Sequence, residues 1–173
     1  MKDKYIDVAE KAICKYIKDG EKIDVPEGLP EEMTEQRKGV FVTIKKKGQL
    51  RGCIGTYRPS QENIALEIIN NAINAAKNDP RFPPIKESEI PALNVSVDVL
   101  SEPEPCNEKD LNPDRYGVII KRGSRRGLLL PNLEGIDTKE EQLKHVKRKA
   151  GIPHDCSDYQ LQRFEVQRHS EVK

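Results

Sequence analysis

The sequence has no tryptophan, and tyrosine and phenylalanine bring its aromatic content to only 5%. Proteins that bind single-stranded nucleic acid stack the bases on aromatic side chains, so this composition argues against a base-stacking surface. Charge does not favour nucleic acid either, because 30 basic and 29 acidic side chains leave a formal net charge of +1. Basic stretches at 45–47, 122–126 and 144–149 are interpreted as solvated faces. We therefore do not expect a nucleic-acid-binding protein.

Long apolar runs and a secretory h-region are also absent, so we expect neither a membrane span nor export. The four cysteines, Cys14, Cys53, Cys106 and Cys156, are far apart, and no pair has CxxC spacing. That spacing argues against a zinc knuckle or a disulfide framework. The sequence predicts a cytoplasmic protein with reduced thiols and indicates no metal site or cofactor.

The strongest local pattern is a hairpin at residues 39–55. Apolar residues alternate along 40–46, a Lys-Gly turn follows, and a second strand carries Leu50-Arg51-Gly52-Cys53-Ile54-Gly55. If the alternation continues, Arg51 and Cys53 point to the same side of the sheet. A neighbouring guanidinium would favour the thiolate form of Cys53, which is the form that attacks electrophiles. The hexapeptide is therefore the best candidate site.

A second interpretation of Cys53 stays open at this point. Free cysteine is among the most buried residue types and often acts as a small apolar side chain. The glycines on either side of it, Gly52 and Gly55, then mark only tight packing of the sheet.

The other expected elements follow from periodicity and capping signals. They are a helix over 3–18, a polar connection over 21–38, a helix over 61–77 capped by Ser60, a strand over 93–99, strands over 117–121 and 126–130, a helix over 138–150 and a strand over 159–167. Between the second helix and the third strand lies 78–84, Asn-Asp-Pro-Arg-Phe-Pro-Pro. Its three prolines fix the backbone, so we expect a rigid turn that can form a wall of the Cys53 site.

The chain also contains a repeat. Residues 46–54 align with residues 121–129, and each segment follows a Gly-Val strand and precedes a loop and a helix. This order predicts two hairpin-plus-helix units that arose by duplication. In the alignment Gly52 matches Gly127, whereas Cys53 matches Leu128. The scaffold thus does not require a thiol, which favours a specific role for Cys53.

With the hexapeptide at 50–55, the chain resembles the AMMECR domain family, and in particular its prokaryotic branch called AmmeMemoRadiSam system protein A. Further matches to that family lie at residues 79–84, 97–101, 125–131 and 149–152. The resemblance implies an α+β fold formed by residues 1–173 as a single domain. It also implies two lobes, about 1–105 and 106–173, that share a mostly antiparallel, barrel-like sheet.

Two functions follow for this site. In the first, the protein is an enzyme or enzyme component in which Cys53 reacts and Arg51 activates it. The expected substrate-binding residues are Thr56, Arg58, Asp79, Arg81 and Arg126. A histidine base is not evident, since the three histidines, His145, His154 and His169, all lie in the last third, and His169 is expected in a frayed tail.

In the second, the protein is a non-catalytic adaptor whose arginines recognise an anionic ligand or a partner protein. Arg51, Arg58, Arg81 and Arg126, with Tyr57, would line that groove. For either function, the resemblance implies association with a Memo-like protein and a radical-SAM protein in a modification pathway.

Overall fold

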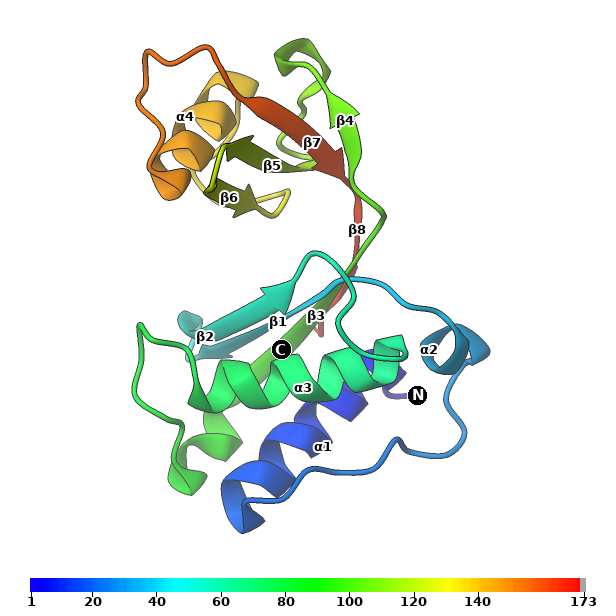
Figure 1. The fold of residues 1–173 in the computed structure, drawn as a ribbon. Helices are drawn as coiled ribbons and strands as arrows, with labels where there is room; N and C mark the ends of the chain where they lie inside the picture. The colour runs from blue at the N-terminus through cyan, green and yellow to red at the C-terminus, as the bar shows by residue number, and fades with distance from the viewer. Residues whose placement is uncertain (172–173) are drawn as a thin grey trace. The chain divides into compact units, whose positions relative to one another are not determined.

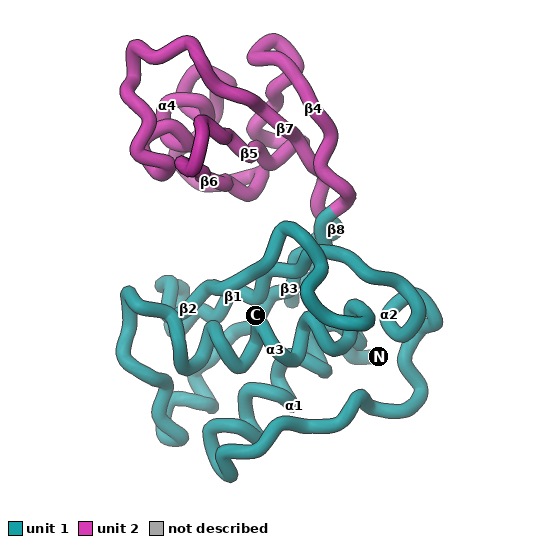
Figure 2. Tube along the Cα trace, viewed as in Figure 1, with its two compact units in different colours: residues 1–100, 167–173 teal, residues 101–166 magenta. Residues whose placement is uncertain are grey.

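The computed structural model describes residues 1–171, which divide into two compact units (Figure 1, Figure 2). The first unit comprises Met1–Leu100 and the C-terminal stretch that begins at Gln167. The second unit is Ser101–Val166. Each unit has its own sheet and its own apolar core.

The first unit is a four-stranded sheet in the order β2-β1-β3-β8, with helices on one face (Figure 1). Its strands are β1 (Val40–Lys46), β2 (Gln49–Thr56), β3 (Leu93–Leu100) and β8 (Val166–His169). Its helices are α1 (Lys4–Asp19), the short α2 (Glu31–Glu35), α3 (Ile64–Lys77) and the 3-10 helix η1 (Glu87–Ala92). The alternate residues Val40, Val42 and Ile44 of β1 are fully buried in the core with α1 and α3.

The predicted first helix is confirmed as α1, and its ends follow the expected capping chemistry. Asp3 accepts hydrogen bonds from the amides of Tyr5 and Ile6, and Gly20 ends the helix with φ of 71°. The connection over 21–38 contains the short helix α2, which the sequence analysis missed. A single side chain of this helix, Met33, is buried in the core, and one apolar residue gives no periodic signal for a helix. Within residues 1–171, no helix combines the length and the hydrophobicity that crossing a bilayer requires.

The predicted hairpin is confirmed as β1 and β2, but it contains a bulge. Thr43 pairs with Cys53 and Ile44 with Gly52, yet Lys45 pairs with Leu50, so Arg51 is the extra residue. The bulge interrupts the strict alternation from which Arg51 and Cys53 were expected to share a face. Register is thus the first point at which the structure departs from the sequence pattern.

The second unit repeats this plan. Its sheet has the order β4-β7-β5-β6, formed by β4 (Glu104–Cys106), β5 (Gly117–Arg122), β6 (Arg125–Leu129) and β7 (Gln160–Phe164). The helix α4 (Lys139–Ala150) packs on β5 and β6, and the 3-10 helix η2 (Glu108–Asp110) precedes β5. Thr138 caps α4 by accepting a hydrogen bond from the amide of Glu141, as its sequence predicted.

The duplication is visible in both topology and packing. The orders β2-β1-β3 and β6-β5-β7 correspond, and the fourth strand of each sheet is supplied by the chain that leaves the other unit. A Cβ added at Gly52 would lie 2.2 Å from the carbonyl oxygen of Ala75 in α3, and one at Gly127 would lie 2.8 Å from that of Val146 in α4. The repeated glycine therefore lets each helix approach its hairpin closely.

The expected α+β class with antiparallel sheets is confirmed, but the barrel-like sheet is wrong. Residues 1–171 form two open four-stranded sheets rather than one sheet shared by lobes 1–105 and 106–173. The two sheets stay separate because the units exchange strands. β4 follows β3 in sequence but pairs with β7 in the second sheet, and β8 returns to the first sheet.

Gly52→Ala tests the close approach of α3 to β2. We expect the substitution to lower the free energy of unfolding by about 2–4 kcal/mol, because the new methyl group overlaps backbone that cannot move aside independently. Urea unfolding followed by circular dichroism measures this change. Leu50→Ala on the same strand, where the side chain is 41% exposed, is the control and is expected to change stability by no more than about 0.5 kcal/mol. Equal urea midpoints for the two variants would contradict the packing argument.

Candidate functional site

Cys53 lies on the face of the first sheet opposite the helices. In the register of the sheet it pairs with Thr43 of β1, which pairs in turn with Ser96 of β3. Its Sγ atom is 3.2 Å from the hydroxyl oxygen of Thr43, within hydrogen-bonding distance. The thiol is partly exposed. This face thus presents a thiol in a row with two hydroxyl-bearing residues.

A buried carboxylate fixes the backbone of Cys53. Asp79, which is only 3% exposed, accepts a hydrogen bond from the Cys53 amide at 2.9 Å. The guanidinium of Arg81 donates to both oxygens of Asp79, at 3.1 and 2.8 Å, and to the Cys53 carbonyl at 3.3 Å. These bonds hold the pKa of Asp79 well below its usual range. The rigid segment over 78–84 therefore lies against the outer edge of β2 and holds Cys53 in place.

A second ion pair lies on the same face. Asp98 of β3 is nearly buried, and Arg168 of β8 binds it through two hydrogen bonds, Nε to Oδ1 at 2.8 Å and Nη2 to Oδ2 at 2.9 Å. The sequence analysis missed this pair, because 70 residues separate its members and only the return of β8 to the first sheet joins them. The one available signal was a charged residue, Asp98, within the valine-rich strand.

The surroundings of the thiol raise its pKa. Burial is the largest cause, and the negative charges of Asp98 and Asp79 act in the same direction. The hydrogen bond with Thr43 and the positive charge of Arg81 act against them, without reversing the result. The sequence analysis expected the opposite direction, a pKa lowered by Arg51. The resting thiol of Cys53 is therefore protonated at neutral pH.

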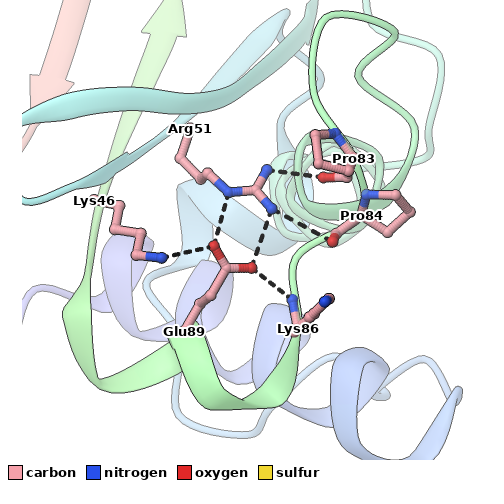
Figure 3. A network of polar contacts seen from close by, with 6 residues as sticks. All are labelled: Lys46, Arg51, Pro83, Pro84, Lys86 and Glu89. Atoms are coloured by element: carbon pink, nitrogen blue, oxygen red, sulfur yellow. Dashed lines mark hydrogen bonds and ion pairs between the residues drawn. The ribbon is translucent and has the colours of Figure 1, made fainter.

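Arg51 has a different set of partners (Figure 3). Its Nε and Nη2 donate to the two oxygens of Glu89 in η1, at 3.0 and 3.1 Å, and Nη1 donates to the Pro83 carbonyl at 2.8 Å. Lys46 donates to the same carboxylate at 3.0 Å. The Arg51 side chain is 13% exposed. Arg51 thus fastens the proline-rich segment and η1 to the hairpin, and its charge is compensated by Glu89.

Thr56 takes part in a buried network that the sequence analysis also missed. Glu67 of α3 is fully buried, and its carboxylate accepts hydrogen bonds from the Thr56 hydroxyl, the amide and hydroxyl of Ser60, and the amide of Gln61. Ser60 was expected to cap this helix, but Asn63 caps it instead. Glu67 lies among the apolar residues of this helix, and a buried acid needs hydrogen-bond partners, so its position in the sequence could have indicated the network.

The remaining predicted residues lie elsewhere. Arg58 is exposed, with its guanidinium 5.5 Å from the ring centre of Tyr57. Arg126 is on β6 of the second unit, as a cross-strand neighbour of Lys121. The site therefore brings together Cys53, Asp79 and Arg81 from the predicted set, and it adds Thr43, Asp98 and Arg168.

The histidines supply no hydrogen bond to this thiol in the part of the chain that the structure describes. His145 and His154 belong to the second unit. His169 was expected in a frayed tail, but it ends β8, stacks on Tyr5 with ring centres 3.9 Å apart, and lies 2.7 Å from the Asp3 carboxylate. Over the same residues, no three histidine, cysteine or acidic side chains cluster closely enough to hold a metal ion.

Acid unfolding tests the Arg51–Glu89 contact. Its hydrogen bonds lower the pKa of Glu89 from 4.5 to about 2. A carboxylate with a depressed pKa in the folded state contributes stability above pH 4.5 and loses it as the pH falls toward 2. We expect Glu89→Gln to lower the free energy of unfolding at pH 7 by about 2 kcal/mol and to flatten its fall with acid.

The measurement is urea unfolding at a series of pH values. Glu87→Gln is the matched control, because Glu87 lies on the same 3-10 helix and is exposed. Parallel pH curves for wild type and Glu89→Gln would show that the contact adds nothing to stability.

Comparisons with known proteins place the chain in a family. The AMMECR1 family model matches residues 6–169. A protein from Thermotoga maritima is 50% identical over 167 residues, which span 95% of this chain and 96% of that protein. A Clostridium acetobutylicum protein is 48% identical over 98% of this chain, but the chain spans only 36% of that longer protein. A solved structure, of an uncharacterized protein from Pyrococcus horikoshii, is 35% identical and superposes with a TM-score of 0.88, covering 97% of this chain and 92% of that one. The chain therefore belongs to the AMMECR1 family.

Proposed function

We propose that the protein carries out a thiol-dependent reaction at Cys53. The observation that carries this proposal is the Asp79–Arg81 clamp, in which the buried carboxylate of Asp79 binds the amide of Cys53 and the exposed guanidinium of Arg81 binds its carbonyl. Burying a carboxylate is costly unless it is paired, so this arrangement uses considerable interaction energy to hold one residue. The equivalent position in the second unit is Leu128, and the duplicated fold therefore does not require a thiol there.

The protonated state of the thiol limits the reaction class. No histidine of residues 1–171 bonds to Cys53, and Asp79 and Asp98 are each bound by an arginine. The thiolate is the attacking form, so the resting thiol first loses its proton to water, and a polarised double bond takes a proton back from water once the Sγ–carbon bond has formed. In the addition as a whole an Sγ–carbon bond forms, the S–H bond breaks, and a proton ends on the second atom of the double bond. The substrate is thus the final proton acceptor.

A second candidate is an adaptor function, with a partner that completes the site. The observation that favours it is the Clostridium acetobutylicum relative, in which this domain makes up 36% of the chain. A domain joined to a longer chain in one organism is a natural candidate for association with a separate protein in another. The partners proposed from the family resemblance are a Memo-like protein and a radical-SAM protein.

Alkylation tests the thiol function directly. We expect iodoacetamide to modify Cys53 in the folded protein, with a rate that keeps rising above the ordinary thiol pKa of about 8.5 because the pKa of Cys53 is raised. Peptide mass spectrometry across a pH series gives the rate for each cysteine, and Asp98→Asn is expected to shift the Cys53 profile to lower pH. Cys156→Ser is the control and should leave the Cys53 profile unchanged. A folded protein in which Cys53 stays unmodified over the whole pH series, while another cysteine reacts, would exclude thiol chemistry.

Size-exclusion chromatography tests the adaptor function. We expect the purified chain to co-elute with a Memo-like or radical-SAM protein of the same organism at micromolar concentration. Elution of every mixture as separate components would argue against stable association, whereas co-elution without Cys53 reactivity would favour the adaptor over the enzyme.

A further inference from the structure

Two basic stretches that the sequence analysis treated as separate solvated faces meet in the second unit, where α4 lies against the β5–β6 hairpin (Figure 1). Arg122 and Arg125 face each other directly across the end of that hairpin. Arg125 donates a hydrogen bond from Nη1 to the carbonyl of Gly151, the C-cap residue of α4, at 2.7 Å. The Gly151 amide in turn donates to the Arg148 carbonyl at 3.1 Å. The hairpin end and the last turn of α4 are therefore adjacent, and we call Arg122, Arg125 and Arg148 the arginine cluster.

The arginine cluster is not neutralised by the chain itself. Its three members are exposed, and among residues 1–171 no carboxylate forms an ion pair with any of them. Other arginines of the same unit are compensated, since Arg115 pairs with Glu165 at 3.1 Å and Arg163 pairs with Glu104 at 2.7 Å. The cluster thus differs from these paired arginines in presenting its positive charge to solvent.

Contacts within the protein account for only part of the cluster. A cation at the C-terminus of a helix interacts favourably with the helix dipole, which explains Arg125 and Arg148. Like charges directly opposite each other on neighbouring strands destabilise a sheet, however, and Arg122 opposite Arg125 is such a pair. Over residues 1–171 the side chain of Arg122 forms neither a hydrogen bond nor an ion pair that would offset this cost. A negatively charged partner would remove the repulsion.

The surroundings of the cluster favour a protein partner over a nucleic acid. Proteins that bind single-stranded nucleic acid stack the bases on aromatic side chains. In this unit Tyr116 already contacts two guanidinium groups, 4.9 and 4.2 Å from its ring centre, Tyr159 contacts an ammonium group at 4.6 Å, and Phe164 is buried. A net charge of +1 also gives the chain little long-range attraction for a polyanion. Guanidinium groups bind carboxylates through paired hydrogen bonds, so acidic side chains supply the matching charge.

We propose that the arginine cluster is a docking surface for an acidic segment of a partner protein, one that presents several aspartate or glutamate side chains. Arg122 and Arg148 bind carboxylates of that segment, and Arg125 adds its charge from the helix terminus. The surface belongs to the second unit, whereas Cys53 belongs to the first. The proposal therefore goes beyond the thiol function and does not rest on it.

A labelled acidic peptide tests this surface. The probe is a fluorescein-labelled peptide in which glutamates alternate with serines, and fluorescence polarisation measures its Kd for the full chain at low salt. We expect Arg122→Gln and Arg148→Gln each to raise Kd about two- to fivefold, because each removes one exposed charge–charge contact. Arg115→Gln is the matched control, since it removes the same formal charge from an exposed position of the same unit, and it is expected to leave Kd unchanged.

Further variants separate charge from structure. Arg122→Lys keeps the positive charge and is expected to retain most of the affinity, whereas Arg122→Glu combined with Arg148→Glu reverses both charges and is expected to abolish binding. Added salt is expected to weaken binding to wild type, because it screens exposed charges. Arg125 is not substituted, since its loss would also remove a hydrogen bond from the end of α4. Circular dichroism checks that each variant keeps the wild-type fold.

Several outcomes would overturn the proposal. Wild type that does not bind the acidic peptide, or binds the matching glutamine–serine peptide as tightly, would show that the cluster does not recognise carboxylates. The same Kd for Arg122→Gln, Arg148→Gln and Arg115→Gln would show that only overall charge acts. An oligodeoxythymidylate of equal charge that binds more tightly than the peptide, and loses affinity in the same two variants, would assign the surface to nucleic acid instead. Alkylation of Cys53 is expected to be unchanged in all these variants, so this proposal and the thiol function can fail separately.

Discussion

The candidate site depends on one buried carboxylate. Asp79 lies between the amide of Cys53 and the guanidinium of Arg81, and it joins the edge of the first sheet to the proline-rich segment. An edge strand exposes unpaired backbone groups, which proteins usually cover or twist away. Here Asp79 and Arg81 occupy both polar backbone groups of Cys53, so the same contacts protect the edge and fix the thiol.

The residues of the hexapeptide have separate physical roles. Arg51 is the bulge residue and fastens η1 through Glu89, whereas Gly52 admits the backbone of α3. Gly55 provides space for the ring of Phe41, which lies where a Cβ would be. The side chain of Cys53 is half-buried and forms a hydrogen bond with the hydroxyl of Thr43. A compact motif thus combines three structural requirements with one thiol.

The duplicated units share the packing glycine but not the thiol. Both units need a glycine under a helix, and both have it, at Gly52 and Gly127. The second unit has a leucine, Leu128, in place of the thiol. Exchange of the fourth strands also brings Arg168 into the first sheet, although it lies near the far end of the chain. The site is therefore assembled from the first unit and from the strand that returns to it.

The main helices, the first hairpin and the repeat were predictable from the sequence, because periodicity, caps and turn residues are local signals. The helix capped by Asp3, the hairpin on either side of Gly48 and the helix capped by Thr138 were all predictable for that reason. Proline also predicted a rigid turn over 78–84, whereas the hydrogen bonds of Asp79 and Arg81 to Cys53 are seen only in the structure.

The partners of the charged residues depend on the tertiary structure. Arg51 is the bulge residue of β2 and pairs with Glu89, which is 38 residues away in the sequence. Asp98 pairs with Arg168, which is 70 residues away. Such pairings depend on register and on which strand returns to which sheet, and neither is encoded in a local pattern. The direction of the thiol's pKa follows from those pairings. For that reason Cys53, Asp79 and Arg81 were predictable as neighbours, whereas Thr43, Asp98, Arg168 and the electrostatics of the site were not.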